Sequence, residues 1–293
     1  MTPLSIIIAT YQGVLKIPNA LASLLNQNYT KFNVIIIIDG STDNTHQKII
    51  DFIAEFKPFY KIEIHSITNR GRCFARNKGA SLSKAEYLLF MDDDMILEND
   101  CIDKHITFLN KKNKTITVGT QLNKLANKAN EFERYKNHYS FKWHKQLIKQ
   151  GNPFNHENPY LTAAHFCIKR IDFLGLNGFD EAYNISEDFE LAKRAYENQF
   201  IIYYLPNAVA YHNESINLSY LVKQEYGYLI SREKLYSISY VPKIGNHFFA
   251  NSFIETLLLK FNVFKIFPNN FKFKLYSYII YSKALIKIHE AKN

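Results

Sequence analysis

Cysteine is scarce in this sequence, and its spacing argues against two common uses of the residue. The three cysteines are scattered along the chain, without the paired spacing of a zinc motif or a disulfide framework: Cys73, Cys101 and Cys167. The sequence therefore predicts a protein of a reducing compartment, with neither disulfides nor a cysteine-based zinc site.

Long hydrophobic runs are also missing. No window approaches the roughly 18 uninterrupted apolar residues that a membrane-spanning helix needs. The first apolar segment begins at Ser5, without the basic region and cleavage site of a signal peptide before it. We expect a cytoplasmic protein that is either soluble or peripheral at the inner face of the cell membrane.

Composition and charge are those of a globular protein with a basic tail. Hydrophobic residues make up 47% and charged residues 22% of the sequence, which excludes a disordered or fibrous chain. The formal net charge is +9, and residues 216–293 contribute +7 of it, from eleven Lys and Arg against four Glu. Such a tail can face anionic lipid, nucleic acid or solvent, and we expect no nucleic-acid partner.

The first hundred residues alternate between short apolar runs and segments of helical periodicity. The apolar runs are typical of buried strands: Leu4–Ala9, Val34–Ile38, Ile62–Ile67 and Tyr87–Met91. The segments between them space their apolar residues as helices do: Val14–Asn28, Asp43–Phe56 and Arg72–Ser83. This βαβαβαβ order predicts an α/β fold with a mostly parallel sheet flanked by helices, whose ligands bind at the carboxyl ends of the strands.

The rest of the chain predicts additions to this sheet and a helical extension. The expected elements are a strand at Ile116–Gln121, a helix at Lys128–Lys149, a loop at Gln150–Pro159, a strand at Tyr160–Ile168, a helix at Glu187–Asn198, and short strands at Ile201–Leu205 and Val209–His212. Only helical patterns follow Leu218. We therefore predict a catalytic domain over residues 1–215 and a basic, aromatic-rich helical region over residues 216–293.

Three adjacent carboxylates, Asp92, Asp93 and Asp94, end the fourth predicted strand. Their mutual repulsion is poorly screened at the end of a buried strand, so the run is costly unless a cation occupies it. Carboxylate ligands suit Mg²⁺ or Mn²⁺ that carries substrate phosphates. The alternative is an acidic cap at the start of a helix.

Polar residues also end the other predicted strands. Thr10 and Tyr11 follow the first strand and suit the packing of a planar base, while Asp39, which ends the second, could accept the N–H of a uracil. Arg72 and Arg76 share one helix face and could lie along a diphosphate. The alternatives are ordinary turn and capping residues after the second strand and a solvated helix face.

The second half of the sequence offers a candidate base and a further metal ligand. Glu187 and Asp188 begin a predicted helix, where a carboxylate beside a sugar pocket could act as a general base. The same residues could simply start an amphipathic helix. His212 ends the last strand and is either a third metal ligand or a structural histidine.

Taken in order, these residues resemble the glycosyltransferase family 2 proteins with the GT-A fold, many of which build bacterial surface polysaccharides. The resemblance extends from about residue 4 to about residue 215. The matching segments are the opening strand at 5–11, the acidic-glycine-serine turn at 39–43, the Ala-Arg-Asn segment at 75–79, the Asp-x-Asp motif at 92–94 and the Glu-Asp pair at 187–188.

The resemblance implies a role for each of these residues. Uridine would be held by Thr10, Tyr11 and Asp39, and Arg76 would lie near the diphosphate or orient Asp92. The donor's ribose or sugar would contact Asp92, with Asp93 in the same donor-binding run. The metal, Mn²⁺ or Mg²⁺, would be bound by Asp94, with Asp92 and His212 as further ligands. Catalysis would rest on Asp188 as general base and on its neighbour Glu187.

Two departures from the family pattern refine the expected activity. Ile38 replaces the first of two usual acidic residues before Gly40, whereas Asp39, expected to touch the base, is present. The Gln-x-x-Arg-Trp motif of processive synthases is missing, and the only tryptophan, Trp143, precedes the predicted base. We therefore expect a non-processive, inverting enzyme that transfers a sugar from a UDP-sugar to a glycan or lipid-linked acceptor.

Two other function classes and two roles for the tail remain open at this stage. A nucleotidyltransferase could use the same carboxylates but would more typically carry a Gly-rich phosphate loop, and a non-catalytic carbohydrate-binding protein would not turn over. The tail alternates lysines with apolar residues: Phe261, Val263, Phe264, Ile266, Phe267, Phe271 and Phe273. It predicts either peripheral membrane association or a packed helical subdomain.

Overall fold

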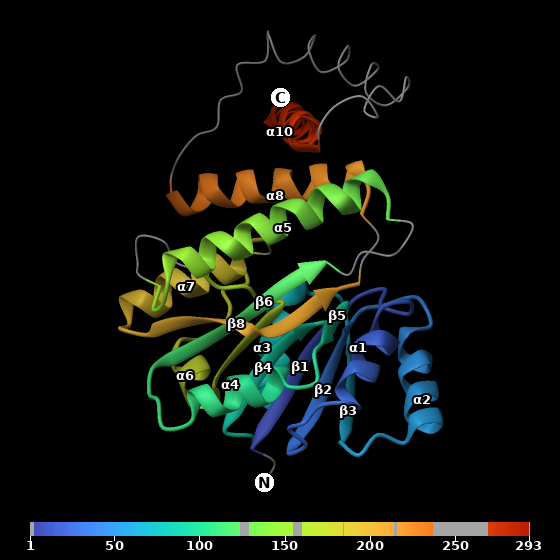
Figure 1. The fold of residues 1–293 in the computed structure, drawn as a ribbon. Helices are drawn as coiled ribbons and strands as arrows, with labels where there is room; N and C mark the ends of the chain where they lie inside the picture. The colour runs from blue at the N-terminus through green and yellow to red at the C-terminus, as the bar shows by residue number, and fades with distance from the viewer. Residues whose placement is uncertain are drawn as a thin grey trace. The chain divides into compact units, whose positions relative to one another are not determined.

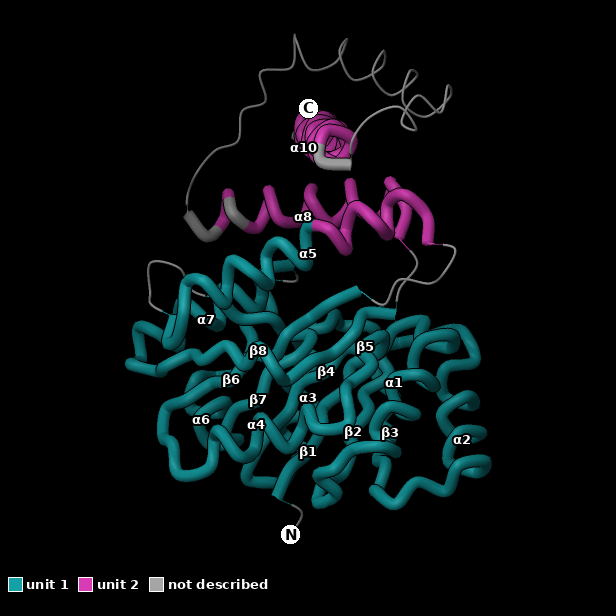
Figure 2. Tube along the Cα trace, viewed as in Figure 1, with its two compact units in different colours: residues 1–124, 139–214 teal, residues 125–138, 215–293 magenta. Residues whose placement is uncertain are grey.

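The computed structural model describes residues 3–123, 129–154, 160–183, 185–213, 216–236 and 269–292. The chain divides into two compact units, one of residues 1–124 and 139–214 and the other of residues 125–138 and 215–293 (Figure 2). The helix over 131–150 contributes residues to both units. The predicted domain boundary at residue 215 stays a prediction. Residues 125–138 were expected in the first domain, whereas they group with the second unit.

One eight-stranded sheet organises the first unit (Figure 1). Its strands are β1 (Leu4–Thr10), β2 (Phe32–Asp39), β3 (Ile62–Ile67), β4 (Tyr87–Asp92), β5 (Met95–Leu97), β6 (Thr115–Asn123), β7 (His165–Lys169) and β8 (Ile201–His212). The order across the sheet is β3-β2-β1-β4-β7-β6-β8-β5. The helices of the chain are α1 (Ile17–Leu24), α2 (Thr45–Phe56), α3 (Arg72–Leu82), α4 (Cys101–Leu109), α5 (Glu131–Gln150), α6 (Arg170–Gly175), α7 (Glu187–Glu197), α8 (Leu218–Tyr236) and α10 (Asn269–Lys292).

The parallel half of the sheet is the part predicted from the apolar runs, and the prediction is confirmed. β2, β1 and β4 are parallel neighbours, with β3 parallel to β2 at the edge. Because side chains alternate along a strand, Ile6 and Ile8 of β1 enter one hydrophobic core while Ile7 enters the core on the opposite face. A strand buried on both faces has no polar side, which explains its uninterrupted apolar sequence.

The other half of the sheet mixes directions. β7 is antiparallel to β4 and β6, β8 is parallel to β6, and β5 is antiparallel to β8. The two short strands predicted at 201–205 and 209–212 are one strand, β8, because a register shift between Gly119 and Thr120 of β6 accommodates Pro206. The strand predicted at 160–168 begins only at His165, and residues 155–159 of the predicted loop lie outside the described residues.

The described part of the second unit is mainly helical, as the sequence predicts for the C-terminal region. Residues of α8 and α10 form a small core of Leu229, Ala284, Leu285 and Ile288. None of the helices in the described ranges combines the length and the apolar character that crossing a bilayer requires. Most of the tail's Lys-Phe alternation, from Phe261 to Phe267, lies outside the described residues, so its membrane association stays a prediction.

Candidate active site

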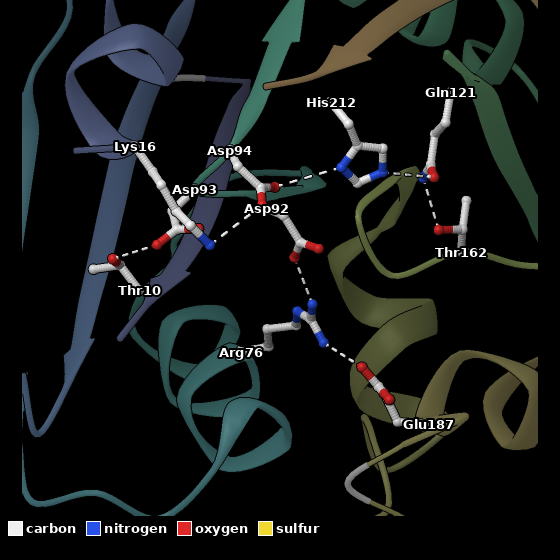
Figure 3. Close-up of polar contacts among 10 residues, drawn as sticks. All are labelled: Thr10, Lys16, Arg76, Asp92, Asp93, Asp94, Gln121, Thr162, Glu187 and His212. Carbon is white, nitrogen blue, oxygen red and sulfur yellow. Dashed lines mark hydrogen bonds and ion pairs between the residues drawn. The ribbon is translucent and has the colours of Figure 1, made fainter. Parts of the chain in front are cut away.

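The carboxyl ends of β1, β2 and β4 meet at one edge of the sheet, and polar residues predicted to bind ligand lie at or just after them. Figure 3 shows those at the ends of β1 and β4. Asp92 is the last residue of β4, and Asp93 and Asp94 form the turn that leads into β5. The backbone N–H of Asn213, just after β8, donates to the Asp94 carbonyl at 2.8 Å. The acidic run and His212 are therefore brought together by the backbone itself.

Arg76 is the centre of a buried ion-pair chain in this site (Figure 3). Its guanidinium donates to Asp92 at 2.5 Å and to Glu187 at 2.6 Å, and the residue is only 3% exposed. Although burial acts to lower the pKa of Arg76, the two carboxylates outweigh it and raise the pKa, so the group stays charged. Of the two roles predicted for Arg76, this geometry favours the orientation of Asp92.

Asp93 is held by Thr10 of β1, and it shares Lys16 with Asp94. The hydroxyl of Thr10 donates to its carboxylate at 2.6 Å, and the Lys16 ammonium lies 3.9 Å from the other oxygen. Burial raises the pKa of Asp93 to about 6 against the opposing effect of Lys16. Gly13 makes this contact possible, because a Cβ there would lie 2.0 Å from the Thr10 hydroxyl and 2.8 Å from the carboxylate.

Asp94 and His212 face one another through atoms without a hydrogen bond. Asp94 Oδ1 and His212 Nδ1 are 3.6 Å apart, and each is buried and lacks a hydrogen-bond partner among the described residues. Burial opposes ionisation of Asp94, yet His212 and Lys16, whose ammonium is 3.4 Å away, hold its pKa well below the usual range. A carboxylate oxygen and an imidazole nitrogen at this separation fit two ligands of one divalent cation.

Gln121 orients the His212 ring and was missed in the sequence. The Gln121 carbonyl lies 3.2 Å from His212 Nε2, while its amide donates to the Thr162 hydroxyl at 2.7 Å. If Nε2 carries the proton, the Nδ1 lone pair lies on the side of the ring that faces Asp94, where a cation bound by both residues would lie. Gln121 lies near the end of β6, so the strand-end reasoning used elsewhere could have found it. Lys16, before α1, carries no comparable signal.

Asp188 is the half-buried carboxylate of the first turn of α7. Its Oδ1 accepts the Phe189 N–H at 2.8 Å. Burial, followed by the charge of Glu187, raises its pKa to about 7. Glu187 is ion-paired with Arg76. Asp188 is therefore the better candidate for a base that works near neutral pH.

The predicted uridine-binding residues lie on neighbouring strand ends. Tyr11 is 53% exposed, which leaves its ring available for stacking. Asp39 is buried, and its two carboxylate oxygens accept the backbone N–H groups of Arg70 and Gly71 at 2.8 and 2.9 Å. Asp39 thus fixes the loop before α3 and keeps one further lone pair on each oxygen for a ligand.

The profile described as glycosyl transferase family 2 matches residues 5–170, more than half of the chain. The chain belongs to glycosyltransferase family 2.

Two curated relatives of this family 2 chain are similar over shorter segments. An uncharacterized glycosyltransferase of Haemophilus influenzae is 32% identical over 122 residues, which cover 41% of this chain and 47% of that protein. The poly-beta-1,6-N-acetyl-D-glucosamine synthase of Staphylococcus epidermidis is 34% identical over 99 residues, 33% of this chain and 23% of the synthase. The aligned segments therefore cover less than half of either relative.

Solved structures of low sequence identity share the fold of this family 2 chain. The mannosyltransferase PcManGT of Pyrobaculum calidifontis, in complex with GDP-Man and Mn²⁺, has a TM-score of 0.68 at 15% identity and covers 99% of this chain and 88% of its own. Residues 1–349 of S. aureus TarS, in complex with UDP, have a TM-score of 0.55 at 17% identity and cover 98% of this chain and 91% of their own. The fold is GT-A, as the motif order predicts.

Proposed function

We propose that this family 2 chain is a non-processive, inverting, metal-dependent glycosyltransferase. It moves a sugar from a UDP-sugar to a hydroxyl group of a glycan or lipid-linked acceptor, in the synthesis of a surface polysaccharide. The observation that carries the proposal is the facing pair of buried atoms, Asp94 Oδ1 and His212 Nδ1, that have no hydrogen-bond partner within the described part of the chain. Mn²⁺ or Mg²⁺ held there, with Asp92 nearby, would offset the negative charge that grows on the departing UDP.

Asp188 acts as the base in this proposal. Its carboxylate takes the proton from the acceptor hydroxyl while the hydroxyl oxygen attacks the anomeric carbon, and the bond from that carbon to the UDP oxygen breaks. A single displacement of this kind inverts the anomeric configuration. Arg76 forms ion pairs with both Asp92 and Glu187. It therefore fixes the position of Asp92, the proposed donor-binding carboxylate, relative to the first turn of α7, which carries Asp188.

Metal dependence gives the first prediction. Chelation with EDTA should lower UDP release by at least about 10²-fold, and Mn²⁺ should restore it, because a cation at a leaving diphosphate supplies several kcal/mol. Asp94→Asn and His212→Ala should each raise the Mn²⁺ concentration needed for half-maximal rate. Asp51→Asn, at an exposed carboxylate of α2, is the matched control and should leave this requirement unchanged. Transfer that is insensitive to EDTA contradicts the metal role.

Nucleotide recognition gives the second prediction. UDP with Mn²⁺, at about 100 times its Kd, should raise the Tm by about 5–10 °C. GDP at the same concentration should raise it less, since Tyr11 and Asp39 are proposed to hold a uracil. Tyr11→Ala should reduce the UDP shift, whereas Tyr11→Phe keeps the stacking ring and should retain most of it. A larger shift with GDP would assign the donor to the guanosine class.

Product analysis separates this proposal from the two other function classes. A nucleotidyltransferase using the same carboxylates would release pyrophosphate instead of UDP. A non-catalytic carbohydrate-binding protein would release neither. A screen of UDP-sugars with Mn²⁺, read as UDP release, distinguishes all three outcomes in one assay.

A further inference from the structure

A second cluster of metal-ligating side chains lies inside the first unit, apart from the acidic run. Cys101 and His105 are one turn apart on α4, and His165 begins β7. All three residues are completely buried, at 0% exposure. Their ligand atoms lie within 4.8 Å of one another.

The spacing of the three groups is hard to satisfy with hydrogen bonds alone. His165 Nε2 is 3.0 Å from the Cys101 sulfur and 3.1 Å from His105 Nε2. A neutral imidazole nitrogen offers either one lone pair or one proton, so it can make only one full hydrogen bond at a time. Two neighbours therefore compete for His165 Nε2, whereas one cation among the three atoms would satisfy all of them.

The distances are close to those of a zinc site. Donor atoms about 2.0–2.3 Å from one tetrahedral Zn²⁺ stand about 3.3–3.8 Å apart, so the two separations from His165, 3.0 and 3.1 Å, would have to widen by less than an ångström on binding. A thiol and two imidazoles are soft or borderline ligands, which favour Zn²⁺ over the Mn²⁺ or Mg²⁺ that carboxylates prefer. Three protein donors leave the fourth tetrahedral position to a water molecule.

The surroundings orient the two rings for such a role. His105 Nδ1 is 2.8 Å from the Thr117 hydroxyl, so the proton can lie on Nδ1 and the Nε2 lone pair can face the cluster. Gly119 makes room for the other ring, because a Cβ there would lie 2.1 Å from His165 Cε1.

We propose that Cys101, His105 and His165 form a zinc site, separate from the site proposed for the catalytic metal. The linear spacing of the cysteines predicted no such site, because His165 joins Cys101 and His105 only through the fold. The cation would tie α4 to β7. His165 pairs with Met91 in the antiparallel ladder, and the next residue, Asp92, donates its N–H to the Ala164 carbonyl at 3.2 Å. The bound zinc would thus brace the strand end that carries the acidic run.

Cobalt substitution of the wild-type protein tests the proposal directly. The full chain is stripped with a strong chelator and titrated with Co²⁺, and the near-ultraviolet band that arises from a cobalt–thiolate bond is recorded. We expect this band to saturate at a single equivalent and to disappear when Zn²⁺ is added. Only a bound cysteine produces it, so a cation held by Asp94 and His212 cannot account for it.

Variants identify which thiol is responsible. Cys101→Ser and His105→Gln should abolish or strongly weaken the band. Cys167→Ser is the matched control, because Cys167 is also buried and lies two residues beyond His165 on β7, outside the cluster. It should retain the band. Asp94→Asn should retain it too, so the two metal proposals can fail independently.

Stability provides a second readout. Zn²⁺ at about 100 times its Kd should raise the Tm of the stripped protein by about 5–10 °C, and should not raise that of the His105→Gln variant to the same extent. Absence of the thiolate band in the folded wild type overturns the proposal and leaves a hydrogen-bonded core triad. The same conclusion follows if the Cys167→Ser variant loses the band while Cys101→Ser keeps it.

Discussion

Replacing Asp188 with asparagine is expected to lower the rate of sugar transfer by on the order of 10²-fold or more, because general-base catalysis typically contributes that much. The amide keeps the size of the side chain but cannot take the acceptor's proton. UDP binding, measured by the Tm shift, should be preserved. Asp180→Asn, at an exposed carboxylate before α7, is the control and should turn over normally. Near-normal transfer by a folded Asp188→Asn protein would remove Asp188 from the mechanism.

The pH dependence of the same residue supplies a second measurement. Because the pKa of Asp188 is raised to about 7, the rate should fall as the pH drops below 7 and the carboxylate is protonated.

The raised pKa of Asp188 also affects the stability of the fold. The folded state binds this proton more tightly than the unfolded state, so stability contributed at low pH is lost as the pH rises toward 7. Asp188→Asn, which cannot ionise, should therefore have a higher Tm than the wild type at pH 8.

Replacing Arg76 with methionine should cost about 3–5 kcal/mol of unfolding free energy, because it leaves buried carboxylates without their partner. Asp92 and Glu187 both depend on this one guanidinium, and Glu187 is 4% exposed. Urea unfolding measures the loss. Arg76→Lys should recover part of it, since an ammonium keeps the charge but cannot hold both carboxylates with the same planar fork.

The control for Arg76 is an exposed ion pair whose arginine lies just before α3. Arg70 and Glu181 are 3.5 Å apart, with side chains 52% and 47% exposed. Exposed pairs contribute about 0–1 kcal/mol, so Arg70→Met should have little effect on stability. If Arg76→Met proved no more destabilising than Arg70→Met, the ion-pair chain would not be what holds Asp92 and Glu187 together.

The sequence predicted the parallel half of the sheet well and the mixed half less completely. All-apolar runs such as Val34–Ile38 are recognisable because burial on both faces removes every polar position from the strand. β5 has only three residues, too few for a periodic signal, and α4 was missed along with it. β8 was divided in two at Pro206, since residues 206–208 of β8 have no partners in β6 and interrupt the strand pattern in the sequence, although the strand continues beyond them.

For the candidate site, the sequence located the carboxylates, and the family resemblance offered Arg76 as a partner of Asp92, but the other partners were not predicted. The run from Asp92 to Asp94 was evident from charge crowding at a strand end, and His212 from its position at the end of the last strand. The contacts of Arg76 with Glu187 and of His212 with Gln121 join residues more than ninety positions apart. Such pairings depend on how α7 and β6 pack, which no local pattern specifies. The roles assigned to these residues stay predictions.

The Arg76 chain also has a consequence for the order in which the molecule assembles. One guanidinium on α3 links a strand end sixteen residues away with a helix start 111 residues away. Closing the second link requires most of the chain to have condensed, because contacts of large sequence separation form at a high entropic cost. A fragment ending before α7 would retain Asp92 and Arg76 but lack Glu187, the second carboxylate that holds the guanidinium in place. The geometry of the candidate active site would thus form late in folding, after the parallel strands have paired.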